Sequence, residues 1–69
     1  MKYKGKIGQI EFTASVRTWA KTRHDWELRS DDSVLCAVCE DYFKTPELAQ
    51  DDLKAWLDKV GAVYQEVTQ

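Results

Sequence analysis

Two cysteines, Cys36 and Cys39, stand three positions apart in Cys-Ala-Val-Cys, a spacing used by zinc sites and by redox pairs. A tetrahedral zinc site needs four ligands, and this chain adds a single histidine, His24, to the pair. A redox pair needs a helix N-terminus to stabilise its thiolate. Residues 34–40 instead predict a strand, in which positions three apart point to opposite faces. We therefore expect two packing residues and no metal or cofactor, with a zinc ion bridging two copies as the remaining alternative.

His24 and several adjacent carboxylates are the other groups that could catalyse a reaction. His24 could act as a general base oriented by Asp25 or Asp31, but its charged neighbours predict an exposed loop and we expect no serine or cysteine beside it. Paired catalytic carboxylates need a pocket that shifts their pKa values, and a chain of 69 residues offers little depth for one. The three glycines are scattered and form no phosphate-binding loop. We expect a protein without enzymatic activity.

Length and composition predict one soluble domain spanning residues 1–69. The apolar share of 43%, with three tryptophans, argues against disorder. No apolar run approaches the roughly 20 residues of a membrane-spanning helix. The charged start of the chain is not a secretory signal, so we expect a cytoplasmic protein that is not attached to a membrane.

The charges are distributed unevenly along the chain. Residues 1–24 carry six basic residues and one acid, whereas residues 25–69 carry four basic residues and eleven acids. The basic segment, with Tyr3 and Trp19, could suit a nucleic acid. The chain as a whole has a pI of about 5.2, and nucleic-acid-binding domains are usually basic. We therefore expect no direct nucleic-acid binding, and we interpret the lysines near the N-terminus as protection of an edge strand.

Three strands are predicted before a helix. Residues 10–17 alternate between apolar and polar side chains, which is typical of a strand with one buried face. Residues 18–24 read as a polar, basic connection. Residues 25–29 and 34–40 are predicted to form a hairpin around a turn of serine and aspartate residues. The last of these strands is apolar on both faces and would be central, so one of its faces could contact a second molecule.

The helix is defined by its ends and by its apolar stripe. Thr45 is a suitable N-cap with Pro46 at the first helical position, and Gly61 supplies the C-terminal stop. At 100° per residue, one face carries the apolar residues Ala49, Leu53, Trp56, Leu57 and Val60. Residues 62–68 form a last strand. The prediction is an α+β fold, with an antiparallel sheet of three strands, one helix packed on it and then the last strand.

A resemblance covers residues 26–42 and the helix that follows. This segment is similar to the repeat of the small YegP-like proteins of unknown function. The matching residues are Trp26, Leu28 and Arg29 in the first arm, Leu35, Cys36 and Ala37 in the second, and Glu40, Asp41 and Tyr42 at its end. In this chain Asp32, Ser33 and Asp41 depart from the family pattern at its turn and glycine positions. The resemblance implies units that pair, and therefore a homodimer with a structural or housekeeping role and no catalytic activity.

The acidic residues after residue 24 are the predicted binding site. Asp31, Asp32, Glu40, Asp41, Glu47, Asp51, Asp52 and Asp58 could form a negative patch that attracts a protein partner with a basic surface. In size and acidity the chain also resembles the small anti-CRISPR proteins encoded by phages. That resemblance implies an inhibitor in the host cytoplasm, with these acids and an exposed Trp19 covering the basic nucleic-acid-binding site of a Cas complex.

Overall fold

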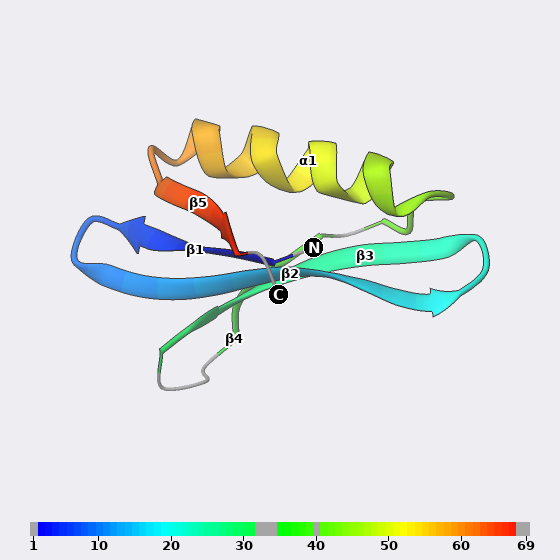
Figure 1. Ribbon diagram of the computed structural model, residues 1–69, viewed down its shortest axis with the longest axis horizontal. Helices are drawn as coiled ribbons and strands as arrows, with labels where there is room; N and C mark the ends of the chain where they lie inside the picture. The colour runs from blue at the N-terminus through cyan, green and yellow to red at the C-terminus, as the bar shows by residue number, and fades with distance from the viewer. Residues whose placement is uncertain (1, 32–34, 40, 68–69) are drawn as a thin grey trace.

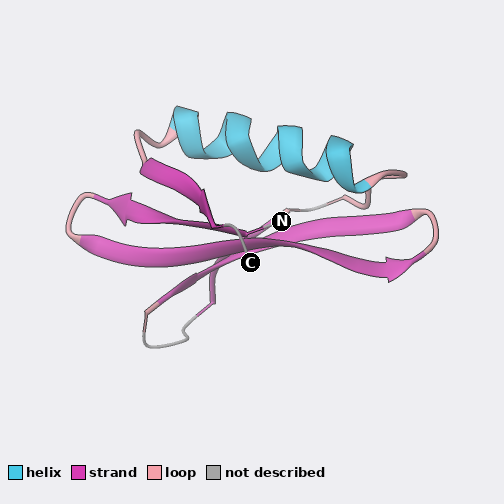
Figure 2. Ribbon diagram, in the orientation of Figure 1, coloured by secondary structure: helices cyan, strands magenta, loops and turns pink. Residues whose placement is uncertain are grey.

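The fold is a five-stranded antiparallel sheet with a single helix on one face, as the computed structural model shows for residues 2–31, 35–39 and 41–67 (Figure 1). The strands lie in the order β4-β3-β2-β1-β5. The elements are β1 (Lys2–Ile7), β2 (Ile10–Ala20), β3 (Arg23–Ser30), β4 (Leu35–Val38), α1 (Pro46–Lys59) and β5 (Val63–Val67). The α+β class is confirmed, and Figure 2 shows the helix and the sheet as two layers. Among the described residues, no helix is long and apolar enough to cross a membrane.

The prediction of three strands before the helix was wrong by one strand, because β1 was missed. Lysines alternate with Tyr3, Gly5 and Ile7 in β1, so the period of two was present but carried few apolar residues. Gly8, at φ 63°, makes the turn into β2. β1 pairs with β2 on one side and with β5 on the other, so its lysines are not on an edge strand.

The predicted connection over residues 18–24 was also wrong. β2 continues to Ala20 and β3 begins at Arg23, which leaves a turn of two residues. The register of β2 against β3 shifts between Thr18 and Ala20, and this irregularity interrupts the alternation on which the prediction depended. His24, predicted to lie in an exposed loop, is a buried strand residue.

Among the described strands, β3 is the one whose consecutive residues are buried on both faces. Residues 24–28 of β3 are all buried, whereas β4 lies at the edge of the sheet. One face of β3 packs under α1 through Trp26 and Leu28. On the other face, Arg17 of the neighbouring strand covers Asp25 with two hydrogen bonds. The homodimer argument from a central, doubly apolar third strand therefore loses its premise.

The core lies between the sheet and α1. It is formed by the buried residues Tyr3, Phe12, Ala14, Trp26, Leu28, Leu53 and Leu57. Thr45 caps the helix as predicted, with its hydroxyl accepting a hydrogen bond of 3.2 Å from the Leu48 N–H. Gly61 ends it at φ 76°. Most of the predicted helix stripe is covered, but Val60 remains exposed at its end.

Candidate functional site

The lysines of β1 and the acids of α1 lie on opposite sides of the molecule. On the sheet, Lys2 pairs with Ser15, which pairs with Glu27, so these residues share the face opposite the core residues Tyr3, Ala14 and Leu28. The alternation of β1 places Lys4 and Lys6 on this open face as well. The side of the molecule covered by α1 instead presents the acids of the helix. The net charge of the chain conceals this separation.

The outer face of α1 carries an acidic ridge, defined here as Glu47, Asp51 and Asp58. All three are exposed, and they lie within about 40° of one another around the helix axis at 100° per residue. Lys54 is exposed beside them. The Tyr64 hydroxyl donates a hydrogen bond of 3.1 Å to Asp58 Oδ1, and burial together with this bond raises the pKa of Tyr64. Among the described residues, no side chain is bonded to Glu47 or Asp51, so their charges are available to a partner.

Asp52 has a different role from its neighbour Asp51. Its Oδ2 accepts a hydrogen bond of 2.8 Å from the indole Nε1 of Trp26, a core residue that is 2% exposed. The ring of Trp26 packs against that of Trp56, with 5.4 Å between the ring centroids. Asp52 therefore satisfies a buried donor of the sheet while its carboxylate remains at the surface.

An aromatic pocket of about 320 Å³ adjoins this carboxylate, between α1, β3 and the segment that follows β4. It is lined by Trp26, Val38, Cys39, Asp41, Phe43, Asp52 and Trp56. Three aromatic residues and two aspartates thus line one small, open pocket. No lysine or arginine is among the lining residues, so the carboxylates of the pocket are not neutralised from within it.

Cys39 is a packing residue of this pocket. Its Sγ accepts a hydrogen bond of 3.3 Å from the Trp26 N–H and donates one of 3.2 Å to the Asp41 carbonyl. Burial raises the pKa of the Cys39 thiol, so it is protonated at neutral pH and a poor nucleophile or metal ligand. Within the described parts of the chain, no group of three or more histidine, cysteine or acidic residues could hold a metal ion.

His24 is held in the sheet by both ring nitrogens. Nδ1 lies 2.9 Å from Thr18 Oγ1, and Nε2 lies 3.2 Å from the Lys21 carbonyl. Its main chain bridges to Phe43, which fixes the segment leading to α1. Both nitrogens therefore have partners within the fold, and no carboxylate is among them.

A network of ion pairs occupies the open face of the sheet. Arg17 binds Asp25 through Nε and Nη2, at 2.9 and 2.8 Å, and reaches Glu27 at 3.2 Å. Arg29 also binds Glu27, at 2.7 Å. Burial opposes the charge on Asp25, but hydrogen bonds from Arg17 and Trp19 and the charge of Arg17 outweigh it and lower the pKa of Asp25. The charges of Asp25 and Glu27 are thus paired within the fold, and both carboxylates are buried.

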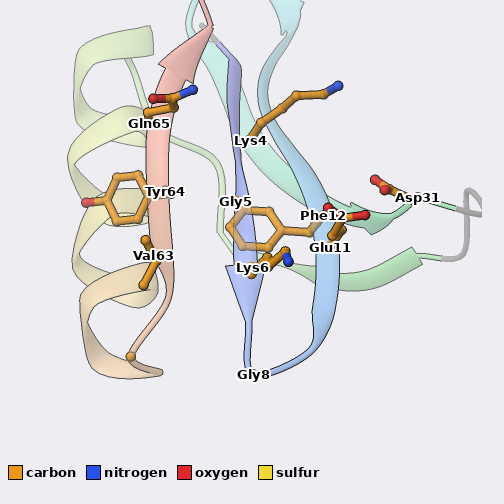
Figure 3. Close-up of a pocket in the computed structure, with 11 residues that line it drawn as sticks. Lys4, Gly5, Lys6, Gly8, Glu11, Phe12, Asp31, Val63, Tyr64 and Gln65 are labelled. Atoms are coloured by element: carbon orange, nitrogen blue, oxygen red, sulfur yellow. The ribbon is translucent and has the colours of Figure 1, made fainter.

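A wider groove of about 730 Å³ lies along β5, β1 and β2, and Figure 3 shows its lining. Charges of both signs surround it, with Lys4 and Lys6 on one strand and Glu11 on the next. Asp31 is at this groove, where its N–H donates to the Glu11 carbonyl at 3.2 Å. Because its lining charges are mixed, this groove favours no single charge of ligand.

The predicted binding residues are therefore divided among several places. Glu47, Asp51 and Asp58 share the helix ridge, and Asp41 and Asp52 share the aromatic pocket. Asp31 lies at the other groove, and Trp19 stacks under Arg17 on the open face, with its ring centroid 5.0 Å from the guanidinium carbon. Asp32 and Glu40 lie outside the described residues.

The aromatic residues of the pocket were not predicted from the sequence. Trp26, Phe43 and Trp56 come from three separate segments, and only the packing of α1 on β3 brings them together. The one available signal was the position of Trp56 at the border of the apolar helix stripe, next to the polar flank that carries Asp52.

Comparison of the chain with protein-family models, with curated proteins and with solved structures finds no match.

Proposed function

We propose that the protein is a non-catalytic binding domain that docks the acidic ridge of α1 on a basic surface of another protein. The observation that carries the proposal is the position of Glu47 and Asp51. Both are exposed on the outer face of the helix, and neither is bonded to another described residue. The helix is held to the sheet by Leu53, Leu57 and the hydrogen bond that Trp26 donates to Asp52, so its packing does not depend on Glu47 or Asp51.

A basic surface of the required kind occurs in proteins that bind nucleic acids. One such surface is the nucleic-acid-binding site of a Cas complex, and the function would then be that of a phage-encoded inhibitor. Glu47 and Asp58 are eleven residues apart on α1, so the ridge spans about 16 Å of helix at 1.5 Å per residue. Acids spaced along a rigid helix could occupy several phosphate-binding positions of such a site at once.

The proposal is tested with two variants that remove the same amount of charge. One carries Glu47→Gln and Asp51→Asn on the ridge, and the control carries Glu11→Gln and Asp31→Asn at the groove on the sheet. The assay measures how far each protein displaces DNA from purified Cas complexes, at low and at high salt. We expect the ridge variant to lose about tenfold in potency, the control to match the parent, and salt to weaken the parent.

Equal activity of the ridge variant and the parent would exclude the acidic-ridge mechanism. If the parent displaces DNA from none of the complexes, the same two variants serve in affinity capture from a bacterial lysate. A partner retained by the control and lost by the ridge variant would then support the ridge and identify its target. A partner retained by both variants would contradict the proposal.

A second candidate function is a homodimer without catalytic activity, as the YegP-like resemblance implies. The observation that favours it is the open edge of β4, where Val38 is 45% exposed and the strand has a paired neighbour on one side only. An unpaired edge can add a strand from a second copy. Light scattering at high concentration tests this candidate, because a mass of one chain would exclude it.

A further inference from the structure

We propose that the aromatic pocket between α1 and β3 binds the guanidinium group of an arginine side chain from the protein partner. This inference rests on the proposed function, because it assumes a partner with a basic surface. It adds a specific contact to a mechanism that otherwise depends on general charge attraction. The pocket is separate from the ridge, because none of the three ridge residues lines it.

The lining of the pocket favours a cation. Asp41 and Asp52 contribute two carboxylates, and no basic side chain is present in the lining to neutralise them. The half-buried Trp56 and Phe43 supply the accessible aromatic surface of the lining, while Trp26, 2% exposed, packs against Trp56. The face of an aromatic ring attracts a positive charge, that of tryptophan most strongly. A cation in the pocket would therefore interact favourably with both kinds of lining group.

Asp52 is held in place for this role before any ligand arrives. Its Oδ2 is fixed by the indole N–H of Trp26 at 2.8 Å, and a carboxylate oxygen pair can accept about four hydrogen bonds in total. Oδ1 has no bond within the described residues and remains free to accept one. A fixed acceptor loses little conformational entropy on binding, which favours affinity from a small contact.

An arginine suits this geometry better than a lysine. The guanidinium group is planar and stacks on aromatic rings, and its forked donors match a carboxylate. It is also less strongly hydrated than an ammonium group, so its transfer into a pocket with aromatic walls costs less. The volume of about 320 Å³ is at the lower end of the range of small-molecule sites, and it suits the end of one side chain.

The pocket lies beside the flank of α1 that borders the acidic ridge, because Asp52 and Trp56 line it. Leu48, Asp52 and Ala55 are exposed along the flank of α1 between the acidic ridge and the pocket. On a helical projection they fall between the ridge and Trp56. A basic surface that covers the ridge would therefore extend over this flank, and an arginine at its border would reach the pocket.

The binding test uses small probes and needs no knowledge of the partner. N-acetyl-arginine amide, N-acetyl-lysine amide and N-acetyl-citrulline amide are titrated while the three indole N–H resonances are followed by NMR. Citrulline has nearly the shape of arginine but no charge. We expect arginine to shift the Trp26 and Trp56 signals saturably, with a Kd on the order of 1 mM. Lysine should bind more weakly, and citrulline should cause no saturable shift.

Trp19 is the internal control, because it lies on the open face of the sheet and is 60% exposed. Equal shifts of Trp19, Trp26 and Trp56 would indicate non-specific contact and overturn the proposal. A response to citrulline equal to that of arginine would overturn it too, as would the absence of any saturable shift with arginine.

A pair of single substitutions separates the pocket from the ridge. Asp41→Asn removes a charge at the pocket, and Asp51→Asn removes the same charge on the ridge. We expect the first to weaken arginine binding about three- to tenfold and the second to leave it within twofold of the parent. The reverse order would overturn the proposal. The proposed function is tested separately by partner binding. If neutralising the ridge abolishes partner binding but Asp41→Asn leaves it unchanged, the arginine contact alone is refuted.

Discussion

The indole Nε1 of Trp26 donates a hydrogen bond of 2.8 Å to Asp52 Oδ2, and this bond joins the middle of the sheet to the flank of α1. Trp26 is a core residue, and Asp52 is exposed. The buried indole ring of Trp26 thus fixes the position of the Asp52 carboxylate at the surface through one hydrogen bond. It also separates the roles of two adjacent aspartates, since Asp51 has no comparable partner among the described residues.

The first prediction concerns the contribution of this bond to stability. Asp52→Ala leaves the buried indole N–H without its partner, and we expect the free energy of unfolding to fall by about 1–3 kcal/mol. Asp51→Ala should change it by less than about 0.5 kcal/mol, because it removes only an exposed charge. Urea denaturation measures both variants. If they are equally stable, the bond from Trp26 is not important for the fold.

This difference also affects how the ridge is tested. A triple charge reversal at Asp51, Asp52 and Asp58 would follow naturally from the sequence, in which the three acids look equivalent. The structure shows that Asp52 is bonded to Trp26 and that Asp58 is bonded to Tyr64. A loss of binding by that variant could therefore come from a disturbed helix, which is why the ridge is tested at Glu47 and Asp51.

The second prediction concerns the attachment of α1. Leu53 is fully buried between the helix and the sheet, and Leu53→Ala should lower the free energy of unfolding by about 2–5 kcal/mol. Leu48→Ala on the same helix should cost less than about 0.5 kcal/mol, because Leu48 is half exposed. Thermal unfolding followed by circular dichroism compares them. Similar melting temperatures would contradict the packing of this helix face.

Local patterns in the sequence were sufficient for the helix and for the core residues Phe12, Ala14, Trp26 and Leu28 of β2 and β3. Thr45, Gly61 and the apolar stripe define α1 because capping and periodicity are local effects. β1 was missed because its lysines alternate with Gly5 and only two larger apolar or aromatic residues, Tyr3 and Ile7. Such a segment becomes recognisable as a strand only through its pairing with β2 and β5. The pocket was missed for a related reason, since Trp26 and Trp56 meet only after the helix packs on β3.

The third prediction concerns pH and the ion pairs of the open face. Arg17 and Trp19 lower the pKa of Asp25 below its ordinary value of 3.8 in the folded state. A lowered pKa contributes stability that is fully present above the unfolded value and is lost as the pH falls through the folded value. The protein should therefore lose stability below about pH 4, in part through protonation of Asp25.

Asp25→Asn provides the check, because this variant cannot titrate at that position. Its urea midpoint at neutral pH should be lower than that of the parent, since Arg17 loses its charged partner. Its further loss of stability on acidification should be smaller. Glu47→Gln is the matched control, and its acid profile should follow that of the parent. Parallel acid profiles for Asp25→Asn and the parent would show that this ion pair does not contribute to acid unfolding.

The fourth prediction concerns the approach of β5 to β1. A Cβ atom added to Gly5 would collide with the Val63 carbonyl oxygen and with Tyr64, so Gly5→Ala requires the backbones of the two strands to separate. Gly8 has open space around it, and an alanine there meets only the cost of φ 63°, about 1–2 kcal/mol. We expect Gly5→Ala to be the more destabilising change and to speed the hydrogen exchange of the β5 amides selectively. An unchanged exchange rate in β5, or a larger loss of stability from Gly8→Ala, would mean that the close contact of β1 and β5 at Gly5 is not maintained in solution.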